Sequence, residues 1–196
     1  MSMKTNLMTA AAVFALSSGA AFAESHMSDA GNPMVGGAEM MPDMTIVENA
    51  SNAENLTTLV AAVQAAGLVD TLSGEGPFTV FAPTNDAFAK LDPAQLEELL
   101  KPENQAALAN ILTCHVVAAD ANSEAIFGMI DNDGGIHQVE TVGGCILDVA
   151  RAGDGDNQDV ITITDQRGQV ATVTQADVFQ SNGVVHVIDT VILPAE

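Results

Sequence analysis

Cys114 and His115 are adjacent in the middle of the chain, and a cysteine beside a histidine is the residue pair of a nucleophile and its general base. Residues 115–117 have the composition of a strand, in which neighbouring side chains point to opposite faces. The two side chains are therefore poorly placed to share a proton. The sequence also lacks a nucleophile elbow, a zinc-protease motif and a phosphate-binding loop, so it predicts a protein that is not an enzyme and needs no cofactor.

Two of the histidines, His115 and His186, are expected to be structural. His115 precedes two valines, and His186 stands between Val185 and Val187, which predicts that both imidazole rings lie in or near the core. A buried imidazole needs a hydrogen-bond partner. We expect Asp86 to be the partner of His115.

Cys114 and Cys145 are the only cysteines. An oxidising compartment favours a disulfide between them, which would stabilise the fold by about 3–4 kcal/mol through loop closure. Two buried free thiols are the alternative, because the sequence does not show whether the Cα atoms lie within bonding range.

The segment 24–44 is polar, contains Gly and Pro, and carries several thioether and imidazole groups. Such groups are ligands for Cu(I), which makes copper binding the alternative function of the chain. Its candidate ligands are His26, Met27, Met40 and Met41. Against this, methionine often fills gaps beside a core, and the spacing here is irregular. We expect no regular secondary structure in this segment.

Two acidic turns, 131–134 and 154–159, offer carboxylate oxygens that suit Ca²⁺. Neither fits the calcium loop of an EF-hand, because the sixth position, where Gly is needed, is Ile136 in one and Asp159 in the other. We interpret both as solvated turns and predict no metal site.

The elements that must position these residues are organised around 78–88, FTVFAPTNDAF. Phe78, Val80 and Ala82 alternate with Thr79 and Phe81, the period of a strand with a buried face. Pro83 has no N–H for the sheet ladder and is expected to end the strand. Thr84 and Asn85 are suited to cap a following helix, and Asp86 suits its positive end.

Helices dominate the first half of the chain and strands the second. Apolar residues at helical spacing run from Leu56 to Ala66 and predict a helix that ends at Gly67. A short helix is predicted at 68–72, and Asp92-Pro93 is expected to begin another. Two more helices are predicted at 106–112 and 121–129. Strands are predicted at 115–117, 136–139, 145–149, 160–164, 170–173 and 184–188. Helices followed by strands indicate the α+β class.

The N-terminus has the pattern of a cleavable secretory signal. Lys4 precedes an apolar run at 7–16, and the small residues at 21–23 predict cleavage after Ala23. The protein is therefore expected in the periplasm or outside the cell, with no membrane insertion of its mature form. The net charge of −21 excludes nucleic-acid binding, which needs clustered Lys or Arg. The acidity itself indicates either solubility or, as the alternative, a cationic partner or bound divalent cations.

Three motifs together resemble the fasciclin (FAS1) domain family. They are FTVFAPTNDAF at 78–88, LTCHVV at 112–117 and NGVVHVID at 182–189, which occur in the family's order and spacing. The resemblance spans about 45–194 and implies the FAS1 fold, with N-terminal helices packed on a β-sheet or wedge formed largely by the C-terminal half. Residues 35–40 also resemble the lead-in of bacterial members, which would pack on the domain.

The resemblance also implies a function and a site. Animal members use an Asp-Ile pair near the C-terminal motif for integrin recognition, and Asp177-Val178 stand at those positions here. The family's Tyr-His adhesion segment corresponds to Cys114-His115 followed by Val116, with Cys in place of Tyr. These residues, Asp177, Val178, His115 and Val116, are the predicted contacts with a cell-surface or matrix protein.

The sequence thus predicts three parts: a signal peptide at 1–23, a Met-rich polar lead-in at 24–44, and one FAS1 domain at 45–194 without an internal repeat. The predicted function is that of a monomeric, exported adhesion or protein-interaction module. The alternative is a copper- or small-ligand-binding protein that uses the Met/His-rich segment. Pro83, Thr84, Asp86, His186, Cys114 and Cys145 are assigned structural roles.

Overall fold

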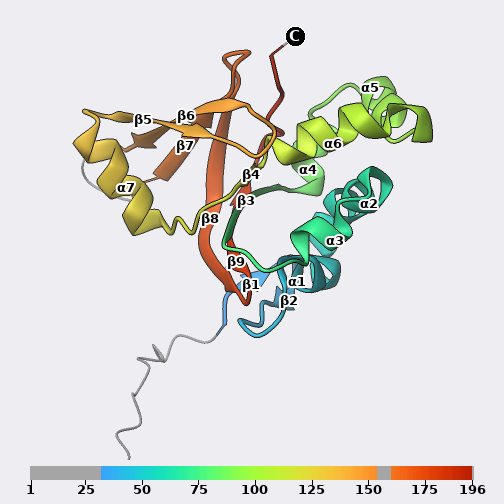
Figure 1. Cartoon of the computed structure of the whole chain (residues 1–196), viewed down its shortest axis with the longest axis horizontal. Helices are drawn as coiled ribbons and strands as arrows, with labels where there is room; N and C mark the ends of the chain where they lie inside the picture. The colour runs from blue at the N-terminus through green and yellow to red at the C-terminus, as the bar shows by residue number, and fades with distance from the viewer. Residues whose placement is uncertain (1–31, 154–159, 196) are drawn as a thin grey trace, which may run out of the picture. The chain divides into compact units, whose positions relative to one another are not determined.

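The computed structural model describes residues 32–153 and 160–195. In this part of the chain the helices mostly come first and the long strands last, as Figure 1 shows. The helices are α1 (Ile46–Asn52), α2 (Thr57–Ala66), α3 (Val69–Leu72), α4 (Asn85–Ala89), α5 (Pro93–Leu99), α6 (Gln105–Thr113) and α7 (Ser123–Asn132), with short 3-10 turns at Glu54–Leu56 and Pro102–Asn104. The strands are β1 (Met34–Val35), β2 (Ala38–Glu39), β3 (Phe78–Pro83), β4 (Val116–Val117), β5 (Ile136–Glu140), β6 (Ile146–Ala152), β7 (Val160–Thr164), β8 (Val170–Gln180) and β9 (Gly183–Ile188).

The main sheet has seven strands in the order β4-β3-β9-β8-β7-β6-β5. All neighbouring pairs are antiparallel except β3 and β9, which run parallel. The sheet curls until the turn after β5 meets the chain at β4: the Val142 N–H donates to the Val116 carbonyl over 2.8 Å. The result is a nearly closed β-region, the predicted α+β architecture.

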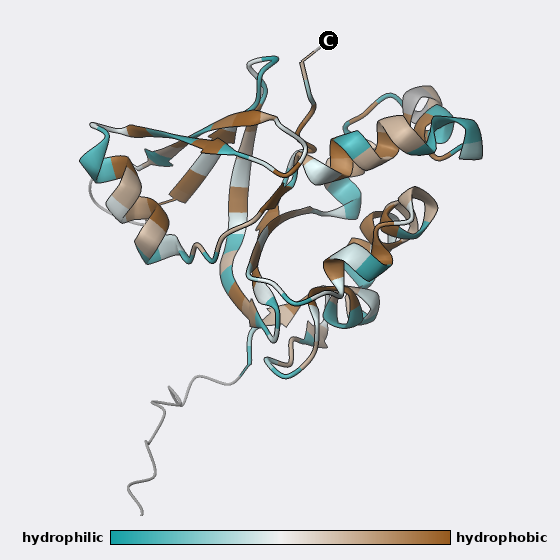
Figure 2. Ribbon diagram, in the orientation of Figure 1, coloured by the Kyte–Doolittle hydropathy of each residue, from teal (hydrophilic) through white to brown (hydrophobic). Residues whose placement is uncertain are grey.

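The central strands β3 and β9 are covered on both faces. On one face Val80 and Val187 pack with helices α1, α2 and α6, and on the other Phe81 and Ile188 pack with α7 and the inner faces of β6 to β8. Figure 2 shows mainly hydrophobic colouring along these strands, interrupted by paler and hydrophilic positions. The outer strand β5 instead alternates between exposed and half-buried residues, because no element covers its outer face.

The organising stretch folds as predicted. β3 ends at Pro83, and the Thr84 side chain accepts a hydrogen bond from the Ala87 N–H to cap α4. Asn85 was also expected to cap α4, but its side-chain oxygen instead accepts a hydrogen bond from the N–H of Thr58, at the start of α2, over 2.9 Å. The predicted ends of two other helices are confirmed as well, since Gly67 ends α2 in the left-handed conformation and Asp92 caps α5.

Two predictions of local structure are wrong. The lead-in was expected to be irregular, but β1 and β2 form a hairpin across Gly36-Gly37, whose positive φ values of 56° and 80° fit a tight turn. The last strand before the C-terminal motif was expected to end at 173, but β8 continues to Gln180. Register shifts between Val173 and Val178 break the two-residue alternation, so the pattern could not show this strand.

Candidate functional site

His115 lies in the core between the two layers, with 2% of its surface exposed. Its Nδ1–H donates to the Ile111 carbonyl over 2.8 Å, and its Nε2 accepts from the Ile192 N–H over 3.0 Å. Burial lowers the pKa of this imidazole to about 4, because the charged form would lose its hydration. The prediction of Asp86 as its partner is wrong: Asp86 is exposed on the first turn of α4.

His186 is the second buried imidazole and uses the opposite tautomer. Its Nε2–H donates to the Ala121 carbonyl over 2.9 Å, and its Nδ1 accepts from the Asp177 N–H over 3.4 Å. The ring stacks on Phe81 with centroids 5.8 Å apart. Burial again lowers its pKa. Since both nitrogens of both rings are committed to backbone groups, neither histidine is free to serve as a general base, and the structural role of His186 fits this geometry.

Asp177 is held at the irregular part of β8. Its backbone has a φ of 58°, and its carboxylate accepts from the N–H of Ser123 over 2.6 Å and from the Ser123 hydroxyl. The Ser123 N–H belongs to the first turn of α7, where a carboxylate is stabilised by the helix dipole. Asp177 therefore fixes α7 to the sheet.

The other three predicted contact residues are buried. The exposed fractions are 2% for His115, 4% for Val116 and 1% for Val178. Val116 and Val178 pack in the helical core, and the His115 ring is bonded inside the protein. This burial disfavours direct contact with a partner, and the recognition role of these residues stays a prediction. The sequence of a motif does not show whether its adjacent aliphatic residues face solvent or the core.

Cys114 and Cys145 form the disulfide that the sequence favoured, with Cα atoms 5.3 Å apart. It links the end of α6 to the start of β6. Both residues are buried, at 0% and 4% exposure, and the described chain has no free cysteine. The cysteine–histidine pair at 114–115 thus has no thiol.

The candidate copper ligands divide into two groups. Met40 is 2% exposed and packs in the helical core, and the sulfur of Met41 accepts a hydrogen bond from the Asn32 side chain. His26 and Met27 lie outside the described residues, as does the predicted signal peptide. Within the described residues no three His, Cys, Asp or Glu side chains gather as a metal ion would require. The turn at 131–134 ends α7, and 154–159 is outside the described ranges.

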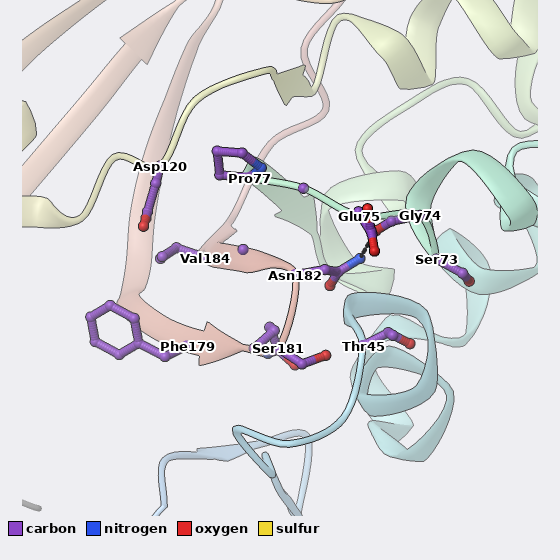
Figure 3. Close-up of a pocket in the computed structure, with 13 residues that line it drawn as sticks. Thr45, Ser73, Gly74, Glu75, Pro77, Asp120, Phe179, Ser181, Asn182 and Val184 are labelled. Atoms are coloured by element: carbon purple, nitrogen blue, oxygen red, sulfur yellow. Dashed lines mark hydrogen bonds between the residues drawn. The ribbon is translucent and has the colours of Figure 1, made fainter. Parts of the chain in front are cut away.

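A cleft of about 550 Å³ lies beside the turn between β8 and β9 (Figure 3). The loop 73–77, between α3 and β3, forms one side, and the end of β8 forms the other. Its lining combines polar and apolar groups: Thr45, Ser73, Gly74, Glu75, Gly76, Pro77, Asp120, Phe179, Gln180, Ser181, Asn182, Gly183 and Val184.

Asn182 fixes the floor of this cleft. Its side-chain N–H groups donate to the carbonyls of Leu72 and Gly74 over 2.8 and 3.0 Å, and its oxygen accepts from the Ile46 N–H over 3.0 Å. One side chain thereby joins α1, the loop after α3 and the β8–β9 turn. Because these bonds use its donors and one lone pair, Asn182 is part of the frame and not of the contact surface.

Two glycines bring the backbones of the cleft together. A Cβ on Gly76 would lie 2.0 Å from the Asn182 carbonyl oxygen, and a Cβ on Gly183 would lie 2.0 Å from that of Phe78. The Phe78 N–H donates to the Asn182 carbonyl over 3.1 Å across the same contact. No other residue type fits such an approach without backbone movement, so the base of the cleft is closely packed.

The contact groups of the cleft are Phe179, Glu75 and Asp120, which the sequence did not single out. Phe179 is 49% exposed at the rim, although large aromatics are normally buried. Figure 3 places Asp120, Val184 and Phe179 on one side and Glu75 beside Asn182 on the other. The signal that could have identified Phe179 is that it is an aromatic residue next to the buried Val178 on a strand, and so faces the opposite side. The register shifts in β8 break this alternation and conceal the signal in the sequence.

The structure thus defines the class of protein: a single α+β domain with a curled mixed sheet, a helical layer and a surface cleft. The fasciclin domain model matches residues 54–194. The chain belongs to the fasciclin (FAS1) domain family.

Its similarity to known members covers most of the chain. It is 47% identical over 155 residues to protein sll1483 of Synechocystis, covering 77% of this chain and 74% of that protein. It is 37% identical over 150 residues to the cell surface glycolipoprotein MPB83 of Mycobacterium bovis, covering 74% of this chain and 58% of that one. A solved FAS1 domain pair from the insect cell adhesion molecule Fasciclin I matches with a TM-score of 0.55 at 30% identity, over 67% of this chain and 42% of that one.

Proposed function

We propose that this protein is an exported, non-enzymatic interaction module of the adhesion type, and that its partner docks at the cleft beside Phe179. The observation that carries the proposal is the half-exposed phenyl ring on the rim of a rigidly framed cleft. Aromatic side chains at such positions contribute a large part of the binding energy of protein interfaces. A frame that does not rearrange also lowers the entropic cost of binding.

Two further observations support the class of function. The solved relative is a cell adhesion molecule, and MPB83 is a cell surface protein. The cell surface is where adhesion modules act. The disulfide fits an exported protein, because such bonds persist in oxidising compartments. No helix in the described ranges has the length and hydropathy to cross a membrane. The His115 and His186 rings are both bonded inside the core.

The test is binding of the chain from Glu24 onward to intact cells and to extracellular matrix from its natural surroundings. Phe179→Ala removes the exposed ring at the cleft, and Val170→Ala is the matched control, since Val170 lies at the other end of β8 with 51% exposure. We expect wild type and Val170→Ala to bind, and Phe179→Ala to lose at least about tenfold in affinity.

Thermal unfolding of each form first shows that it is folded. Failure of the wild-type protein to bind cells or matrix would overturn the adhesion function. Equal binding by Phe179→Ala, with loss in Val170→Ala, would move the interface to the outer face of the sheet.

A further inference from the structure

The charged side chains that line the cleft are all of one sign. Glu75 and Asp120 contribute carboxylates from opposite sides, and both residues are exposed. No lysine or arginine lines the cleft. A group that enters it therefore meets negative charge on two sides.

The chain's own cations are occupied elsewhere. Lys90 pairs with Asp189 over 3.2 Å, and Lys101 pairs with Glu98 over 3.1 Å. Arg151 lies over the Phe127 ring at 4.4 Å, and the Arg167 Nε–H donates to the Pro194 carbonyl over 2.7 Å. None of these four lines the cleft, so none of the lysines and arginines in residues 32–153 and 160–195 supplies it with positive charge.

The aromatic ring adds a second attraction for the same kind of ligand. The face of a phenyl ring carries partial negative charge and attracts an ammonium or guanidinium group placed over it. Phe179 presents its ring at the cleft that Glu75 and Asp120 line. An aromatic face with two carboxylates forms a binding environment for an organic cation.

We propose that the cleft binds a cationic side chain, arginine or lysine, presented by a segment of the partner protein. The proposal rests on the interaction function above and names the chemistry of the partner. An acidic segment would be repelled, and a neutral apolar one would bury two carboxylates without compensation. Arginine is favoured over lysine, since its planar guanidinium both stacks on a ring and bonds a carboxylate.

A divalent metal ion is the other cationic ligand, and the structure disfavours it. Calcium takes six to eight oxygen ligands at close range. The cleft offers two carboxylates on opposite sides, and no grouping of three potential acidic, histidine or cysteine ligands occurs among the described residues. An organic cation, which is larger and stacks on aromatic rings, fits this spacing better.

The test uses a blocked pentapeptide, acetyl-Gly-Gly-Arg-Gly-Gly-amide, titrated into the ¹⁵N-labelled chain from Glu24 onward. The same peptide with citrulline in place of arginine has nearly the same shape without the charge. We expect the arginine peptide to shift the amide signals of Gly74, Gly76, Ser181 and Gly183, which line the cleft. The citrulline peptide should leave them unmoved.

Two double variants separate the cleft from the general acidity of a protein of net charge −21. Glu75→Gln/Asp120→Asn removes the cleft carboxylates, and Glu97→Gln/Glu103→Gln removes the same charge from exposed positions in and after α5. We expect the first to weaken arginine-peptide binding at least about tenfold, and the second to change it less than about twofold, since exposed charges away from the cleft are screened by salt.

Equal shifts with the citrulline peptide, or equal weakening in both double variants, would overturn the inference. The readout also separates the two proposals. If the protein binds cells through Phe179 but the arginine peptide shifts nothing, adhesion stands and the cationic partner is wrong. If the peptide binds and neither cells nor matrix do, the cleft is confirmed as a cation site and the adhesive function is wrong.

Discussion

Two positions on β8, Asp177 and Phe179, are two residues apart and have opposite roles. Asp177 turns inward at a break in the strand and anchors the start of α7 through Ser123. Phe179 lies beyond the break and is half exposed at the cleft. The family resemblance drew attention to Asp177, whereas Phe179 is the more exposed of the two side chains.

The same contrast holds between the buried framework and the cleft as a whole. The framework consists of His115, His186, Asp177, Asn182 and the disulfide, and each of its polar groups is bonded to the backbone or to another framework element. Among the described residues, the contact groups of the cleft make no such bonds. Changes to the framework should therefore alter stability, and changes to the contact groups should alter binding.

Removal of the disulfide should have the largest effect. The double variant Cys114→Ala/Cys145→Ala opens a loop with a sequence separation of 31, and the chain-entropy model gives a loss of about 4 kcal/mol in the free energy of unfolding. Urea unfolding of the variant, and of wild type with and without reductant, measures it. Unfolding curves that do not differ would show that the bond contributes nothing to the framework.

Asn182→Ala should cost about 3 kcal/mol in the free energy of unfolding. It leaves the Ile46 N–H and the carbonyls of Leu72 and Gly74 without their partner in a buried region. Urea unfolding gives the value, and Ser181→Ala, one residue away, is the matched control with an expected change within about 0.5 kcal/mol. Similar losses in both variants would mean that the turn is generally sensitive and that Asn182 has no special role.

Acidification should weaken the framework through His115. Its folded pKa of about 4 lies below the ordinary value of 6.5, so between these pH values the unfolded chain binds a proton that the folded protein does not. The contribution is therefore fully present above pH 6.5 and falls by up to about 3 kcal/mol as pH drops to 4. His186, whose pKa is also lowered by burial, acts in the same direction.

The measurement is the free energy of unfolding in urea at several pH values from 7.5 to 4.5. His115→Gln keeps an acceptor for the Ile192 N–H but does not titrate, so its stability should depend less on pH than that of wild type. Parallel pH curves for the two proteins would show that His115 is not the source of the dependence.

Asp177→Ala should lower the free energy of unfolding by about 2 kcal/mol, because α7 loses its carboxylate partner and alanine is strained at a φ of 58°. Asp177→Asn keeps an acceptor and tolerates this conformation, so it should lose less. Binding to cells, measured per folded molecule, should stay at the wild-type level in both. A folded Asp177→Ala of normal stability that no longer binds would restore Asp177 as the recognition residue.

Phe179→Ala should have the smallest effect on folding and the largest on binding. A half-exposed ring contributes little to the core, so the free energy of unfolding should change by about 0.5 kcal/mol or less. Urea unfolding and cell binding measured on one preparation give both numbers. A loss of stability above about 2 kcal/mol would place Phe179 in the framework and not among the contact groups.

The sequence was sufficient for elements whose signals are local. The strand, proline and cap at 78–84, the glycine that ends α2 and the Asp92-Pro93 start of α5 depend on neighbouring residues alone, and all three are confirmed. The motifs likewise identified the family, because three of them in order cannot easily arise by chance.

Tertiary structure alone decided which residues face solvent. Val116 and Val178 are buried because they pack in the helical core, and alternation in the sequence cannot show which face of a strand is covered. The cleft unites residues from 45, 73–77, 120 and 179–184, which meet only through the parallel pairing of β3 with β9 and the bonds of Asn182. Contacts between segments so far apart depend on the free energy of the whole packed domain, which no local pattern contains.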